Sequence, residues 1–62
     1  MTDFEKTLIK RDELSEEDAR IAKREARKIL YNILENGGSY DEVEDMLAGD
    51  YGLEMDYIFD LL

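Results

Sequence analysis

Apolar residues recur at helical spacing through the middle of the chain, and this pattern predicts one long helix near residues 16–36. Steps of mainly three and four residues place the apolar side chains within an arc of about 100°. These side chains are Ala19, Ala22, Ala26, Ile29, Leu30 and Ile33. Because the alanines come first, we expect a neighbouring helix to approach most closely at that end and the bulk of the core to gather around Ile29 to Leu34.

Start and stop signals predict shorter helices on either side. A hydroxyl residue followed three positions later by an acid is typical of a helix N-terminus, where both side chains satisfy free backbone N–H groups. Three such pairs occur: Thr2 with Glu5, Ser15 with Asp18, and Ser39 with Glu42. Gly37-Gly38 and Gly49 are expected to end helices in a left-handed conformation.

These signals, with the absence of Pro, predict an all-α fold. We expect a single small domain, residues 1–62, built as a bundle of three to four helices near 3–12, 16–36, 40–48 and 54–61. The helix near 40–48 is expected to fold back onto the long helix. Its core-facing side chains are predicted to be Tyr40, Val43, Met46 and Leu47.

The last segment, "DYGLEMDYIFDLL", carries more apolar surface than one docked helix needs. On a helical wheel for residues 54–62 the apolar arc spans about 200°, whereas docking requires little more than about 100°. Asp56 and Asp60 are expected to face away from that arc. The arc comprises Met55, Tyr57, Ile58, Phe59, Leu61 and Leu62.

Two interpretations of this arc stay open. Phe4, Leu8 and Ile9 of the first helix would cover it if all six residues serve the core. Alternatively, part of it is the centre of a protein contact with acids at its rim. The candidate contact residues are Tyr57, Phe59, Leu62, Asp56 and Asp60.

The charge is unevenly distributed. The net charge is −9; residues 1–28 contain eight acids and all eight Lys and Arg, while residues 29–62 contain nine acids and no base. Such a surface repels nucleic acid and anionic membrane and favours solubility or a cationic partner.

A basic face is nevertheless predicted on the long helix. Cations at this spacing, with an aromatic residue among them, are one way to bind phosphate or single-stranded nucleic acid. The alternative is a solvated face paired within the molecule, beginning with Glu16 and Glu17 near Arg20. The candidate residues are Arg20, Lys23, Arg24, Arg27, Lys28 and Tyr31.

Residues 39–62 resemble a helix-turn-helix unit in spacing: a capped helix, a short turn with glycine and a second helix. A recognition helix contacts phosphates and base edges with basic and amide side chains. The corresponding segment of this chain instead carries acidic side chains, Glu54, Asp56 and Asp60. The resemblance therefore does not imply DNA binding.

Catalytic and metal-binding patterns are missing from the sequence. There is no Cys or His, so thiolate, structural zinc and imidazole chemistry are excluded. The acidic stretches "DEVED" and "GDYGLEMD" lack the ligand series of an EF-hand loop. Ser15 and Ser39 have no base to activate them. We expect no enzymatic activity, no cofactor and no bound metal.

No signal peptide or membrane-spanning segment is expected, which favours a cytoplasmic protein encoded by a complete small reading frame. The leading functional hypothesis is an acidic interaction or regulatory module that binds a basic protein surface, with DNA mimicry as its sharper form. Small inhibitors encoded by phages and plasmids provide the analogy in size and charge. The alternatives are a nucleic-acid binder using the basic face and a homodimeric structural protein.

Overall fold

The computed structural model describes residues 1–62 and contains four α-helices and no strand. The helices are α1 (Asp3–Asp12), α2 (Glu16–Glu35), α3 (Tyr40–Met46) and α4 (Ile58–Leu61). A π-helical turn, Leu47–Tyr51, continues α3, and a 3-10 turn, Met55–Tyr57, precedes α4. The predicted all-α bundle is confirmed, with the first turn of the last helix wound more tightly than expected.

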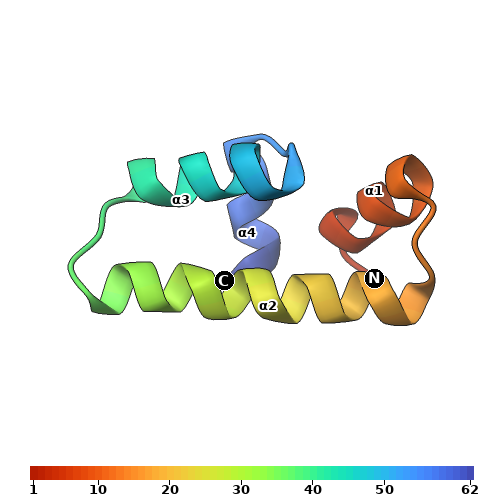
Figure 1. The fold of residues 1–62 in the computed structure, drawn as a ribbon, viewed down its shortest axis with the longest axis horizontal. Helices are drawn as coiled ribbons and strands as arrows, with labels where there is room; N and C mark the ends of the chain where they lie inside the picture. The colour runs from red at the N-terminus through yellow and green to blue at the C-terminus, as the bar shows by residue number, and fades with distance from the viewer.

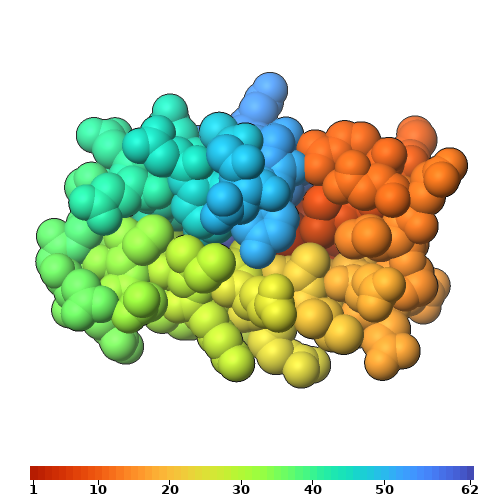
Figure 2. Space-filling model, in the orientation of Figure 1, coloured from red at the N-terminus to blue at the C-terminus, as the bar shows by residue number.

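Helix α2 organises the bundle. It runs along one side of the molecule, with α1 over its N-terminal half and α3 over its C-terminal half (Figure 1). Helix α4 crosses behind α3 and also contacts α2. We call α3 together with the π-helical turn, residues 40–51, the α3 segment. The space-filling view shows α1 and the end of the α3 segment meeting above α2 (Figure 2). The close approach of α1 at the alanine end of α2 agrees with the sequence prediction.

Two of the three predicted helix caps form hydrogen bonds. The Thr2 backbone N–H and hydroxyl both donate to Glu5 Oε1, at 3.1 and 2.9 Å. The Asp18 N–H donates to Ser15 Oγ at 3.1 Å. Ser39 occupies the N-cap position of α3 but its side chain makes no capping bond, so that part of the prediction is wrong.

The end of the third helix also differs from the prediction. Gly49 lies inside the π-helical turn, and the chain leaves the helix only at Gly52, whose φ is 63°. Donation from the Leu53 N–H to the Leu47 carbonyl, at 3.0 Å, closes this end. The longer segment brings the Tyr51 ring to 5.4 Å from the Phe4 ring in an edge-to-face contact.

One continuous core joins all four helices. Phe4 and Leu8 of α1 pack in it beside residues of α4, as expected. Two expectations are wrong: Ile29 is 37% exposed and Tyr40 is 56% exposed. The buried cluster comprises Phe4, Leu8, Ala26, Leu30, Val43, Met46, Leu47, Leu53, Ile58 and Leu61.

Candidate protein-contact site

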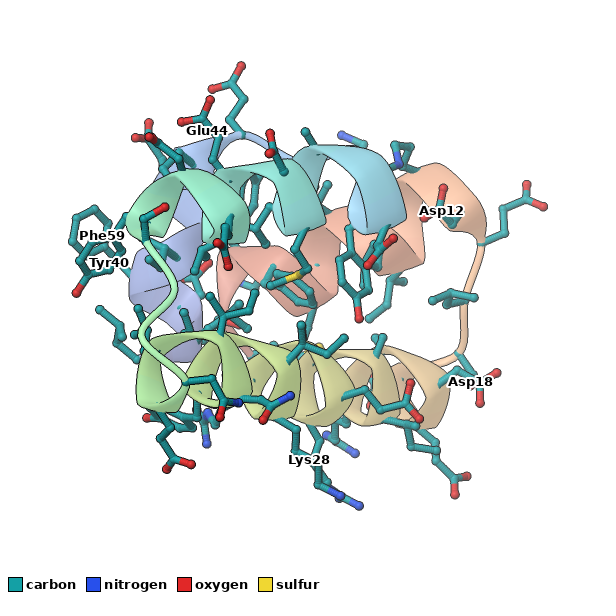
Figure 3. All side chains as sticks on the ribbon, turned by 60° about the vertical axis from the view of Figure 1, so that its left-hand side comes forward. Asp12, Asp18, Lys28, Tyr40, Glu44 and Phe59 are labelled. Carbon is teal, nitrogen blue, oxygen red and sulfur yellow. The ribbon has the colours of Figure 1, made fainter.

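Three large apolar side chains remain uncovered at one end of the molecule. Phe59 is 75% exposed and Leu62 is 57% exposed, and both lie near the exposed Tyr40 ring. Figure 3 shows Phe59 and Tyr40 beside each other at this end. With Met55, Ile58 and Asp56 they line a groove of about 390 Å³, which we call the apolar groove.

The groove follows from how the core holds α4. Ile58 and Leu61 are buried, and this anchoring directs the intervening Phe59 outward, because successive helical residues lie about 100° apart. The Gly37-Gly38 turn starts α3 at Tyr40, and Gly37 has a φ of 79°. Tyr40 is thus the first residue of α3, and its side chain forms the opposite wall of the groove.

An acidic hollow adjoins the apolar groove and shares Asp56 with it. The hollow has a volume of about 300 Å³ and is lined by Asp3, Glu54, Asp56, Tyr57 and Asp60. Its carboxylates do not form a group that could hold a metal ion. The chemistry available here is attraction of a cationic side chain rather than metal coordination.

Two of the predicted contact residues contribute to the internal structure instead. Asp60 was expected to face away, but its Oδ2 accepts a hydrogen bond from the Phe4 N–H at 3.0 Å. This carboxylate satisfies a free N–H in the first turn of α1. The Tyr57 hydroxyl lies 3.0 Å from Thr7 Oγ1, and its ring is partly buried against the core. Phe59, Leu62 and Asp56 remain available to a partner.

The basic face of α2 is divided by internal contacts. Lys23 Nζ lies 3.4 Å from Glu5 Oε1, and Arg20 lies 3.7 Å from Glu16. Arg27 Nε donates to the Leu61 carbonyl at 2.9 Å.

The rest of the basic face is exposed. Arg24, Lys28 and Tyr31 lie on the surface of α2, and Lys28 points away from the other helices (Figure 3). Most of the predicted cations also line one hollow of about 210 Å³ around Glu5, namely Arg20, Lys23, Arg24 and Arg27. The structure therefore brings them together, but gives Lys23 and Arg27 internal partners.

Glu5 is the one buried charged residue. Hydrogen bonding from the Thr2 backbone N–H lowers the pKa of the Glu5 carboxyl, against the opposing effect of burial. The Thr2 hydroxyl and Lys23 lower this pKa further. Glu5 therefore belongs to the internal structure and stabilises the start of α1.

Arg11 is a structural residue that sequence reasoning missed. Its guanidinium pairs with the Asp12 carboxylate at 2.9 Å and donates to the Gly52 carbonyl at 3.0 Å and to the Tyr51 carbonyl. It thereby satisfies carbonyls at the end of the α3 segment. A cation in the last turn of α1 was visible in the sequence, but nothing local indicates a partner about forty residues away.

No protein-family model, curated protein or solved structure matches this chain. None of its helices combines the length and apolar character needed to cross a membrane.

Proposed function

We propose that this chain is a small acidic interaction module that binds a basic protein surface through the apolar groove. The observation that carries the proposal is the exposure of Phe59 and Leu62 beside Tyr40, next to a hollow lined by four carboxylates. Protein contacts typically have an apolar centre with aromatic residues and a polar rim. The absence of any base from residues 29–62 selects for a cationic partner.

The sharper form of the proposal is DNA mimicry. In that form the carboxylates take the place of phosphates and occupy a nucleic-acid-binding protein, and the location proposed for this action is the cytoplasm. Direct nucleic-acid binding has less support, because Lys23 and Arg27 of the basic face already have internal partners. A protein captured through the groove should release its nucleic acid when this chain is added.

The test is affinity capture from a lysate of the native host with three forms of the chain. Wild type and Ile21→Ser should recover the same basic protein, and Phe59→Ser should recover at least about tenfold less of it. Ile21 is a suitable control because it is an apolar side chain on α2, 41% exposed and outside the core cluster. Recovery that is equal for all three forms, or absent at low salt, would contradict the proposal.

A further inference from the structure

We infer that the occupant of the apolar groove is an amphipathic helix with Lys or Arg along one border of its apolar stripe. This inference rests on the proposed function. It adds that the bound part of the partner is a helix, and where the basic residues lie on that helix. It follows from the spacing of the residues that line the groove and from the one-sided position of the acidic hollow.

The groove presents a stripe suited to helix packing. Its lining residues from the end of the chain are Met55, Ile58, Phe59 and Leu62. They stand at positions i, i+3, i+4 and i+7 along the 3-10 turn, α4 and the C-cap residue that follows it. Such a stripe accepts the side-chain ridge of another helix. Ile58 is buried in the core, whereas Phe59 and Leu62 continue the stripe into solvent. Half of the stripe therefore lacks a partner within this molecule.

Tyr40 gives the groove a second wall on α3. The occupant then lies in the angle between α3 and α4, contacting both. Helix-in-groove recognition uses apolar anchors at helical spacing in this manner. Strand addition has no counterpart here, because the fold contains no sheet edge.

The carboxylates beside the groove indicate which kind of helix binds there. The acidic hollow meets the groove at Asp56 and lies on one side of it. A partner helix seated on Phe59 and Leu62 would bring one border of its apolar stripe to the hollow, and a cation there would be attracted. A contact between the grooves of two copies is disfavoured, because it would bring two acidic hollows together and like charges oppose close docking.

The experiment uses two labelled synthetic peptides of identical Leu and Lys composition. One places Leu at intervals of three and four residues, and the other alternates Leu with Lys, which favours an extended chain. Fluorescence anisotropy at about 0.1 M salt, where charges interact over about 10 Å, gives their affinities for the whole chain. We expect the helical order to bind at least about tenfold more tightly.

Matched variants then test the site. Phe59→Ser and the pair Glu54→Gln with Asp56→Asn should each weaken binding of the helical peptide at least about fivefold. The controls are Ile21→Ser and the pair Glu17→Gln with Glu25→Gln, which remove one apolar side chain and two carboxylates from exposed positions on α2. Both controls should bind within about twofold of wild type.

The outcomes separate this inference from the proposed function. Equal affinity for the two peptides, or no binding of either, would overturn the helical occupant. Capture from the lysate that still depends on Phe59 would in that case preserve the proposed function. Self-association of the chain alone that disappears in Phe59→Ser would overturn the inference by assigning the groove to a second copy.

Discussion

Asp60 connects the last helix of the chain to the first. Its carboxylate accepts the Phe4 N–H at 3.0 Å, and this N–H belongs to the first turn of α1, which lacks partners within the helix. A negative charge at this position also interacts favourably with the helix dipole. One side chain thus stabilises α1 and fixes α4, which in turn directs Phe59 outward.

Removal of this contact should lower stability. Asp60→Ala is expected to reduce the free energy of unfolding by about 1 kcal/mol, the usual loss when a capping side chain is truncated. Asp60→Asn retains an acceptor oxygen and should lose less. Urea unfolding followed by circular dichroism measures both, and equal losses for Ala and Asn would show that the hydrogen bond to Phe4 contributes nothing.

Glu5 should make stability depend on acid pH. Its pKa in the folded state lies below its ordinary value, which is about 4.3 in an unfolded chain. The folded state therefore binds fewer protons, so the contribution of Glu5 is full above about pH 4.3 and is lost as the pH falls through the folded pKa. Glu5→Gln should be less stable at pH 7 and should lose less stability on acidification.

Thermal unfolding of wild type and Glu5→Gln between neutral and acid pH measures this difference. Glu35→Gln is the matched control, because it removes an exposed carboxylate with no hydrogen-bonding partner. An acid profile of Glu5→Gln that matches the wild type would exclude the proposed contribution.

At the scale of elements, the end of the α3 segment is the most informative feature. Gly52 has a φ of 63°, and a Cβ there would lie 3.3 Å from Arg11 Nη1. Gly49 lies in the π-helical turn, and a Cβ there would meet nothing within 4 Å. The two glycines should therefore respond oppositely to the same substitution.

Gly52→Ala is expected to lower the free energy of unfolding by about 1–2 kcal/mol, the cost of a left-handed conformation for a residue with a Cβ. Gly49→Ala should raise it by up to about 1 kcal/mol, because glycine weakens a helix interior. Chemical denaturation of both variants provides the comparison. Stabilisation by Gly52→Ala or destabilisation by Gly49→Ala would contradict the described helix end.

The sequence predicted the elements whose determinants are local. The hydroxyl and acid pairs at Thr2 and Ser15 placed the starts of α1 and α2, and Gly37 placed the turn before α3. Neighbouring residues in the sequence do not decide whether the helix ends at Gly49 or at Gly52. The position of this end depends on Arg11, which reaches the carbonyls at the end of the segment, and on packing of Tyr51 against Phe4.

The candidate site was predicted in part, for the same reason. Helical spacing identified the excess of apolar surface that includes Phe59 and Leu62. It could not show that Tyr57 meets Thr7 or that Asp60 meets α1, because both contacts join opposite ends of the chain. The exposure of Tyr40 depends on the direction of the Gly37-Gly38 turn, which periodicity does not specify.

At the scale of the whole molecule, basic and acidic residues are divided between two regions. The bundle measures 34 × 17 × 16 Å, and every cation lies in residues 1–28 on α1 and α2. The charged residues of the α3 segment and α4 are all acidic, and the two most exposed large apolar side chains of the chain after residue 40, Phe59 and Leu62, lie at its end. This division of charge is the basis on which we propose that the apolar groove attracts a cationic partner.

The most direct test of this account is a residue-by-residue map of backbone amide shifts by NMR during titration with the helical Leu and Lys peptide. We expect the largest shifts at Tyr40, at Met55 and at residues 58–62, with little change along residues 20–28. Shifts spread evenly over all acidic residues, or concentrated at the basic face of α2, would contradict a contact centred on the apolar groove.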